Sequence, residues 1–229
     1  SDSAAILNSK ASGLNSKASG NGGAVCVEGG SASMLSGTIN SSTASGNGGA
    51  VSVSGGSFIM SGGTIGAQDA GCSAANGGAV SVTGGTFTMS NSRIQNCTAT
   101  SNGGAVYVQA AGGSGGYSFT ITDGSIESCK GVDGGAIYVS SGSAKMESGS
   151  LLYCNATNNG GGVYVSGGNF DMDSGTLSHS HAKYGGAVYM TGGNFSMYSG
   201  AVIYNVADNN GGAVCVNNGH IVVGKDGCK

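Results

Sequence analysis

The chain has 229 residues, of which 48 are Gly and none is Pro or Trp, and only 8 % of them are charged, for a formal net charge of −3. Soluble globular proteins average about 7 % Gly and about 25 % charged residues. The Lys and Arg residues form no cluster, so nucleic acid is not an expected partner, because phosphate binding needs clustered cations. No run of about 18 apolar residues occurs, so we expect no membrane insertion in this segment.

A phrase of the form Asn-Gly-Gly-Ala-Val-x-Val recurs at a usual spacing of about 26 residues. Its copies begin at Asn21, Asn47, Asn76, Asn102, Asp133, Asn159, Tyr184 and Asn210. A fixed period of roughly 20–50 residues indicates a solenoid or another repeat array. We therefore expect residues 21–229 to form one β-helix domain and residues 1–20 to form a partial coil or a cap. The recurring Asn is expected to form a ladder of amide hydrogen bonds along one corner.

Residues 76–101 serve as the type repeat and predict three short strands separated by turns. Gly77-Gly78 is expected to make the first turn, because Gly tolerates positive φ. The candidate strands, which alternate in polarity, are residues 79–82, 86–89 and 93–97. Strands this short are expected to pair with their counterparts in the next repeat rather than within their own. The expected fold is all-β, a right-handed parallel β-helix with three sheets and about eight coils.

Alignment of the repeats places apolar side chains in columns that a solenoid would bury. The first strand contributes Val25, Val51, Val80, Val106, Ile137, Val163, Val188 and Val214. The second contributes Phe58, Phe87, Phe119, Phe170 and Phe195, with Ala32 and Ala144 as exceptions. Two insertions, Gly71-Cys72-Ser73 and residues 110–116, are expected to be surface loops, because an extra residue inside a strand would reverse its core face.

The repeats resemble those of a known class of surface proteins. Gly-Gly-Ala-Val-x-Val followed by Gly-Gly-x-Phe-x-Met-Ser-Gly-Gly-Thr-Ile, clearest at residues 55–65, 84–94 and 192–202, is similar to the repeats of bacterial cell-surface β-helix proteins. These include polymorphic outer membrane proteins and the repeat adhesins of gut Firmicutes. The resemblance implies an extracellular or cell-surface protein that adheres or builds a surface layer. It also implies a partner on a host or neighbouring cell, either a glycan or a protein.

Within the repeated Asn-Gly-Gly-Ala-Val-x-Val sequence, the outward position of the first strand is the variable one. Four successive repeats have Tyr at this position. The position is occupied by Cys26, Ser52, Ser81, Tyr107, Tyr138, Tyr164, Tyr189 and Cys215. Stacked aromatic side chains can stabilise a sheet by themselves. An exposed row would also suit carbohydrate stacking or contact with another chain, and we expect Tyr107, Tyr138, Tyr164 and Tyr189 to form the binding face.

Catalysis on polysaccharides would need clustered carboxylates. The best cluster is Glu147, Asp171 and Asp173, where a solvated pair between Lys145 and Asp171 is the simpler interpretation. The only Arg, Arg93, lies two to three coils away, so we expect no enzymatic activity, no catalytic residues and no cofactor. His179 and His181 lack a nearby third ligand, so a solvent-facing corner is expected there rather than a metal site.

Seven Cys residues occur in the chain. Cys97, Cys129 and Cys154 fall in one column of consecutive coils, where they form either buried thiols or a disulfide with one sulfur left over. Cys72 and Cys228 stand elsewhere. Cys26 and Cys215 occupy one column in the first and last coils, as a head-to-tail stack of copies would use.

The expected function is an extracellular adhesin or a structural surface-layer protein. The alternative is a filament subunit that associates with itself end to end or laterally, and a polysaccharide-degrading β-helix enzyme is the third interpretation.

Overall fold

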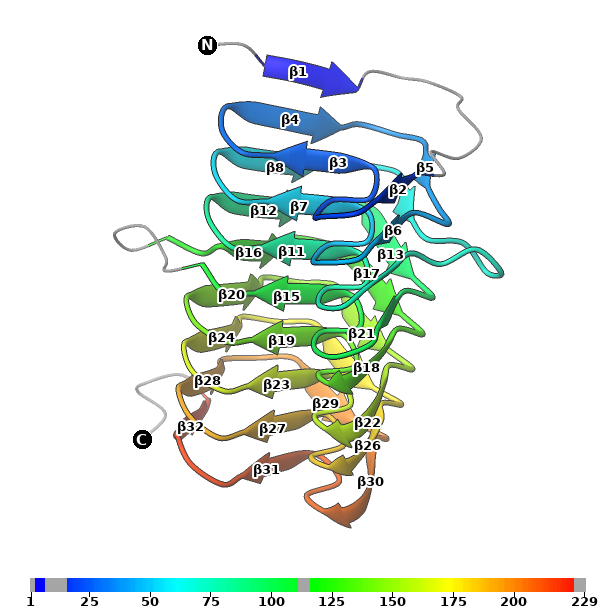
Figure 1. Ribbon diagram of the computed structural model, residues 1–229. Coiled ribbons are helices and arrows are strands. Elements are labelled where there is room, and N and C mark those ends of the chain that lie inside the picture. Colours follow the sequence, from blue (N-terminus) through cyan, green and yellow to red (C-terminus); the bar gives the residue numbers. More distant parts are fainter. Residues whose placement is uncertain (1–2, 7–15, 111–115, 225–229) are drawn as a thin grey trace.

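The computed structural model describes residues 3–6, 16–110 and 116–224, which form strands and no helix. The strands pair in parallel from coil to coil and build a solenoid of about eight turns (Figure 1). In Figure 1 the front strands run to the left and those behind them run to the right as the chain descends, so the coils are right-handed. The predicted all-β parallel β-helix is confirmed.

Four sheets form the walls, and we number them in their order along one coil. The first carries the Ala-Val-x-Val phrase and contains β3 (Val25–Val27), β7 (Val51–Val53), β11 (Val80–Val82), β15 (Val106–Val108), β19 (Ile137–Val139), β23 (Val163–Val165), β27 (Val188–Met190) and β31 (Val214–Val216). The second carries the Phe column and contains β1 (Ser3–Ile6), β4 (Ser31–Met34), β8 (Ser57–Met60), β12 (Thr86–Met89), β16 (Phe119–Ile121), β20 (Ser143–Met146), β24 (Asn169–Met172), β28 (Asn194–Met197) and β32 (His220–Val223).

The remaining two walls are shorter. The third sheet contains β5 (Thr38–Ile39), β9 (Thr64–Ile65), β13 (Ser92–Gln95), β17 (Gly124–Glu127), β21 (Ser150–Leu152), β25 (Thr176–Ser178) and β29 (Ala201–Ile203). The fourth contains β2 (Lys17–Ala18), β6 (Thr43–Ala44), β10 (Ser73–Ala74), β14 (Thr98–Ala99), β18 (Lys130–Asp133), β22 (Asn155–Asn159), β26 (His181–Tyr184) and β30 (Val206–Asn210).

The expectation of three sheets is wrong, because the fourth sheet has no bulky inward column. Its inward residues are Ala44, Ala74, Ala99, Gly131, Ala156, Ala182 and Ala207. The early strands of this sheet have only two residues, too few to show a period of two. These small residues lie outside the main hydrophobic core cluster, and the wall packs against the glycine turns, since a Cβ at Gly78 would lie 2.6 Å from the carbonyl carbon of Thr98.

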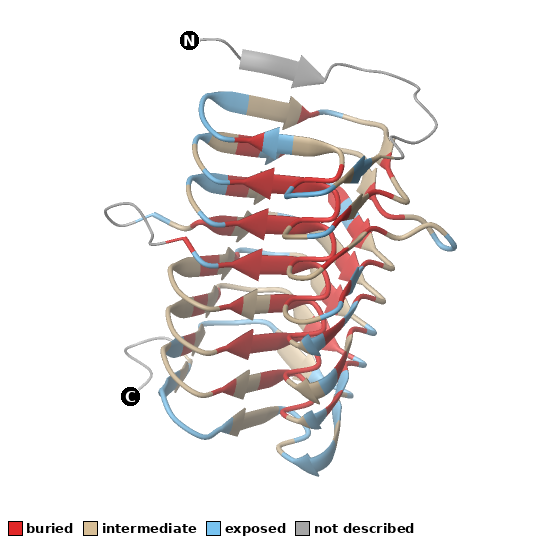
Figure 2. Ribbon diagram, in the orientation of Figure 1, coloured by how far each residue is buried: buried red, intermediate tan, exposed pale blue. Residues whose placement is uncertain are grey.

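The core is a continuous stack of columns. Phe58 and Phe87 stack with their ring centroids 5.1 Å apart, and Phe87 lies 5.8 Å from Phe119. Ala144 replaces Phe in the same register, between Phe119 and Phe170. Each fully buried side chain of this size stabilises the fold by about 1.5–3 kcal/mol. Figure 2 shows burial along the middle coils and exposure of the last one.

The Asn-Gly-Gly turns join the fourth sheet to the first and carry the predicted amide ladder. Asn76 Nδ2 donates to Asn47 Oδ1 at 2.9 Å, and Asn102 Nδ2 donates to Asn76 Oδ1 at 3.1 Å. Asp133 takes the next place and accepts from Asn159 Nδ2 at 2.8 Å. A carboxylate has no N–H to donate back to Asn102, so the chain of amide donors is interrupted there.

Glycine is required in these turns by both conformation and space. Gly103 has φ +64°, and a Cβ at this position would lie 2.1 Å from the carbonyl oxygen of Val106. The following Gly104 is equally crowded, since its Cβ would lie 2.1 Å from the carbonyl oxygen of Gly135 in the next coil. Only a residue without a Cβ fits at either place.

Candidate binding surface at the corner between the third and fourth sheets

The four tyrosines of the first sheet stack in register, with ring centroids 4.8–5.6 Å apart. The expectation that they form an exposed row is wrong. Tyr107 and Tyr164 are each only 9 % exposed, and Tyr138 and Tyr189 are half-buried.

The Asn-Gly-Gly turns explain this burial, because they lie against the outward residues of the first sheet. A Cβ at Gly185 would lie 2.9 Å from Tyr189 Cβ, and a Cβ at Gly77 would lie 3.2 Å from the amide of Tyr107. The Tyr164 hydroxyl is hydrogen-bonded to Thr191 Oγ1 at 3.0 Å. Burial also raises the pKa of Tyr164. The row is therefore mainly a stabilising stack, with little ring surface left for a ligand.

The carboxylates on the outer face of the second sheet are engaged by neighbouring side chains. Lys145 Nζ lies 2.8 Å from Asp173 Oδ2 and 3.7 Å from Glu147 Oε1. Asp171 instead accepts the hydroxyl proton of Tyr117 at 2.8 Å. The simple pair expected between Lys145 and Asp171 is thus replaced by a five-residue polar network.

The cysteine column contains four thiols rather than three. Cys72, Cys97, Cys129 and Cys154 are all buried and free, and the amide of Cys72 donates to Cys97 Sγ at 3.5 Å. The assignment of Cys72 to an insertion is wrong. The extra residues bulge out earlier, where Ala67 and Ala70 hydrogen-bond to each other at 3.2 Å. The other insertion, at residues 110–116, and Cys228 lie largely or wholly outside the described residues.

The cysteine column has a shared structural role at the corner between the third and fourth sheets. Each of three thiols donates to the carbonyl oxygen two residues earlier: Cys97 to Gln95, Cys129 to Glu127 and Cys154 to Leu152, at 3.2–3.4 Å. Asn205 does the same to Ile203 at 3.0 Å, and Ser42 to Asn40 at 3.3 Å. A small hydrogen-bonding side chain therefore closes this corner in several coils.

The residue immediately before that column has positive φ in most coils. It is Ser41, Asn96, Ser128, Tyr153, His179 and Tyr204, with φ between 50° and 57°. Asn and His are enriched in this left-handed conformation, whereas bulky side chains such as Tyr adopt it rarely. The left-handed helical conformation costs an L-residue roughly 1–2 kcal/mol. Three consecutive coils nevertheless place an aromatic side chain there.

Tyr153, His179 and Tyr204 form an exposed stack that we call the corner ladder. Their ring centroids are 4.9 Å and 5.3 Å apart, and the planes are tilted by 31° and 34°. Tyr153 is 54 % exposed and Tyr204 is 72 % exposed. The ladder was not found from the sequence, which indicated only that His179 faces solvent at a corner.

Two further apolar side chains continue the ladder surface at its last rung. Ile203 and Val206 lie beside Tyr204 in the chain and are both exposed. Asn205, between them, fixes this rung, because its Oδ1 accepts the amide of Ser180 at 2.9 Å and its Nδ2 donates to Leu177 O at 2.9 Å. Exposed apolar clusters of this kind mark interaction sites more often than single exposed residues do.

A groove of about 420 Å³ lies on the fourth sheet beside the ladder, and more of its lining surface is apolar than polar. It is lined by Lys130, Gly131, Asn155, Ala156, Thr157, His181 and Asp208. His181 Nε2 lies 2.8 Å from Asp208 Oδ1. Tyr153 and His179 each precede a groove residue, Asn155 and His181 respectively, by two positions, so their Cα atoms lie within about 7.6 Å.

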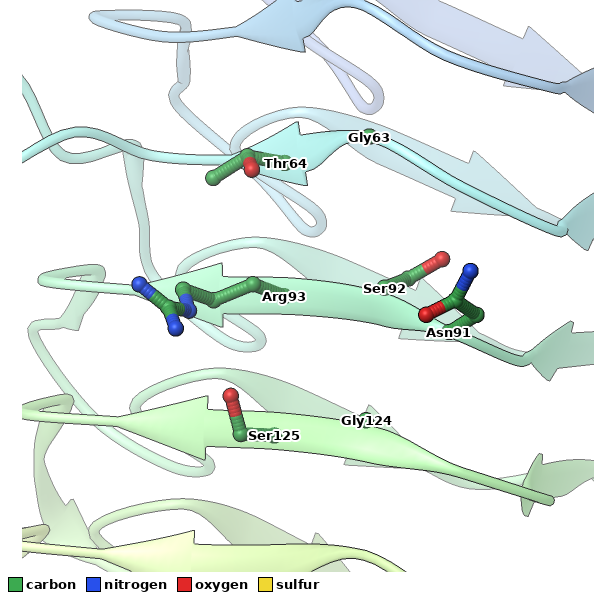
Figure 3. Close-up of a pocket in the computed structure, with 7 residues that line it drawn as sticks. All are labelled: Gly63, Thr64, Asn91, Ser92, Arg93, Gly124 and Ser125. Atoms are coloured by element: carbon green, nitrogen blue, oxygen red, sulfur yellow. The ribbon is translucent and has the colours of Figure 1, made fainter.

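A second hollow, of about 290 Å³, lies on the third sheet and surrounds Arg93. Figure 3 shows that the guanidinium extends away from Asn91 and Ser92, while Gly63 and Gly124 contribute no side chain to the floor. Arg93 Nε lies 3.6 Å from Glu127 Oε1. The hollow is polar and its one cation is already paired.

Within the described ranges no helix is long and apolar enough to cross a bilayer. In the same ranges no three His, Cys, Asp or Glu side chains are grouped so that they could hold a metal ion. Comparison with protein-family models, with curated proteins and with solved structures finds no match. The chain is identified by its architecture alone: a parallel β-solenoid of about eight coils, closed by four sheets.

Proposed function

We propose that this protein is an extracellular binding protein, an adhesin or a component of a surface layer, and that it contacts a surface glycan through the corner ladder and the groove beside it. The observation that supports this most strongly is the left-handed backbone of Tyr153, His179 and Tyr204. Strained backbone combined with exposed aromatic rings is more typical of binding sites than of structural positions.

The choice of residue at the corner favours a binding role over a stabilising one. Other coils fill the same position with Ser or Asn, and Asn fits the conformation at lower cost than Tyr. A stacked aromatic pair contributes about 0.5–1.5 kcal/mol, which at most offsets the backbone cost. Stability alone therefore gives little reason to place aromatic rings here.

The ladder and groove together have the composition that carbohydrate recognition requires. Binding sites for small polar molecules combine apolar or aromatic surface with a few well-placed polar groups. The tilted rings supply apolar surface, and Asn155, Thr157 and the His181–Asp208 pair supply hydrogen-bond donors and acceptors. The surrounding corner is held rigidly by parallel strand pairing on both sides.

A glycan array tests this proposal with a variant whose new residue already occurs at the same position in another coil. The triple variant Tyr153→Asn, His179→Asn and Tyr204→Asn uses a residue that already occurs at the corner as Asn96, so it is expected to fold. Binding should be lost in the triple variant and kept in Ile59→Thr, which removes an exposed apolar side chain from the second sheet. Glycan binding that survives in the triple variant would contradict the proposal.

We further propose that the protein is not an enzyme. Support comes from the second-sheet cluster, where Asp173 pairs with Lys145 and Asp171 accepts from Tyr117, so both carboxylates already have structural partners. Incubation with acidic polysaccharides should release no reducing ends and no unsaturated sugars. Turnover that is lost in Asp173→Asn would contradict this part of the proposal.

A filament subunit is the second candidate, and the placement of two cysteines favours it. Cys26 and Cys215 occupy opposite ends of the first sheet, so a head-to-tail stack would bring them together. Electron microscopy should then show regular fibres that reductant shortens, whereas single rods at all concentrations would argue against this candidate.

A further inference from the structure

We infer that the glycan is a linear, extended polysaccharide that lies parallel to the solenoid axis and presents about one sugar unit to each coil. This inference rests on the proposed function, and it specifies the class and orientation of the ligand. It follows from the arrangement of the ladder and the groove, which run in the same direction.

The ladder repeats along the axis at the spacing of the coils. The ring centroids of Tyr153, His179 and Tyr204 are separated by 4.9 Å and 5.3 Å, close to the spacing of about 4.8 Å between paired strands. This repeat is comparable with the length of one pyranose unit in an extended chain. Successive sugars can therefore meet successive rings without bending, whereas a branched or globular ligand would contact one ring only.

The groove follows the same axis over four successive coils. Lys130 lies on β18, Asn155 and Thr157 on β22, His181 on β26 and Asp208 on β30, and these strands are neighbours in the fourth sheet. Each coil thus adds at least one polar side chain beside the ladder. Because the rings stack on one another, a sugar chain parallel to the axis meets their outward edges, and its hydroxyl groups on one side can reach the groove.

The charges around the groove suit a ligand bound chiefly by hydrogen bonds and ring contact. His181 and Asp208 pair with each other at 2.8 Å, which leaves Lys130 as the unpaired charge among the groove-lining residues. Lys183, on the neighbouring strand β26, lies 5.5 Å from the ring centroid of Tyr184, and Lys17 lies on β2 at the far end of the same sheet. Two scattered cations beside the groove are too few to bind a polyanion by charge alone. Most of the affinity must therefore come from contacts along the length of the ligand.

The test is the dependence of affinity on oligosaccharide length. Calorimetry with β-1,4-linked glucose and N-acetylglucosamine oligomers of two to six units should show affinity rising roughly two- to tenfold per added unit, the range of one aromatic contact. The rise should stop once the oligomer spans the groove. Equal affinity for the two-unit and six-unit oligomers would overturn the inference.

Substitution of one residue of the corner ladder gives a sharper test. Tyr153→Asn removes the first ring of the ladder, so the longer oligomers should lose affinity while the shortest ones keep theirs. The variant Ile59→Thr is the control and should match the unmodified protein at every length. A uniform loss at all lengths in Tyr153→Asn would indicate a single compact subsite and would also overturn the inference.

The two proposals fail in distinguishable ways. If the array shows ladder-dependent binding of glycans but affinity does not depend on length, the binding function stands and the axial ligand does not. If no glycan binds through the ladder, the proposed function itself fails.

Discussion

The imidazole ring of His179 stacks on the phenol ring of Tyr204, with centroids 5.3 Å apart, and both residues have a left-handed backbone, which His adopts more readily than Tyr. The stacking energy and the backbone cost are similar in size. The pair therefore changes the stability of the fold little, so the residue types at these two positions can be selected for ligand binding.

Replacement of Tyr204 by Asn should leave the free energy of unfolding unchanged or slightly higher. The variant loses one tilted ring contact and gains a residue that tolerates φ near 57°. Urea unfolding measures the difference, with Tyr107→Asn as the contrast, because that ring is buried between the turn and Tyr138. A loss of more than about 2 kcal/mol in Tyr204→Asn would mean that the ladder is structural.

Truncation of the Asn76 side chain should lower the free energy of unfolding more than truncation at most other positions of the amide ladder. Asn76→Ala removes the donor to Asn47 and the acceptor used by both the amide and the side chain of Asn102. The expected loss of stability is about 1–3 kcal/mol, because partners are left unpaired in a half-buried corner.

The reciprocal change at Asp133 should act in the opposite direction. Asp133→Asn keeps the acceptor for Asn159 and adds an N–H that can donate to Asn102, so stability should rise or stay constant. Thermal unfolding of the two ladder variants side by side measures both effects. Destabilisation by Asp133→Asn would show that the carboxylate has a role beyond the ladder.

Gly103 and Gly29 form a matched pair for a glycine-to-alanine test. Gly103→Ala places a Cβ 2.1 Å from a carbonyl oxygen at φ +64°, whereas a Cβ at Gly29 meets nothing within 4 Å. Gly103→Ala should destabilise the coil by several kcal/mol, and Gly29→Ala should have almost no effect or be slightly stabilising. Denaturant unfolding separates them, and equal effects would contradict the crowded geometry of the turn.

The ionisation of Tyr117 should make stability fall at high pH. Burial and the hydrogen bond to Asp171 raise its pKa to about 12, against about 10 in the unfolded chain. The unfolded chain therefore loses this proton first, and the stabilisation is present below pH about 10 and is lost as pH rises toward about 12. Tyr117→Phe should show a smaller decline over that window in urea unfolding, and identical slopes would contradict the assignment.

The thiols should differ sharply in reactivity. Cys26 is exposed and Cys215 is partly exposed, whereas Cys72, Cys97, Cys129 and Cys154 are buried, and burial raises the pKa of the Cys129 thiol. A disulfide reagent applied to Cys228→Ser should modify Cys26 first and leave the four column thiols intact until the protein unfolds. Rapid modification of Cys129, read by peptide mass spectrometry, would contradict a closed corner.

Much of the fold could be predicted from the sequence because large side chains mark their own positions. Val51, Phe58 and Ile65 recur once per coil, and their periods of two and about 26 residues define three walls. The inward positions of the fourth wall carry only small residues such as Ala44 and Ala99, which leave no hydrophobic period to detect.

The candidate site was harder to predict, because its two defining properties are conformational. Outward alternation made Tyr107 and Tyr164 look exposed, but the glycine turns that cover them act through space and not through sequence spacing. The positive φ of Tyr153 leaves no trace in its own residue type. The available signal was its alignment with Asn96 and Ser128, residues typical of turns, directly before the cysteine column.

The corner closed by Cys97, Cys129 and Cys154 has an evolutionary consequence. Because these side chains bond the corner from inside, the coil can accept different residues at the neighbouring outward position, at a backbone cost of about 1–2 kcal/mol. A lineage could therefore exchange Ser for Tyr or His one coil at a time, acquiring or losing specificities in single steps. The solenoid keeps a column of variable positions at fixed intervals, on which selection can act at limited cost to the scaffold.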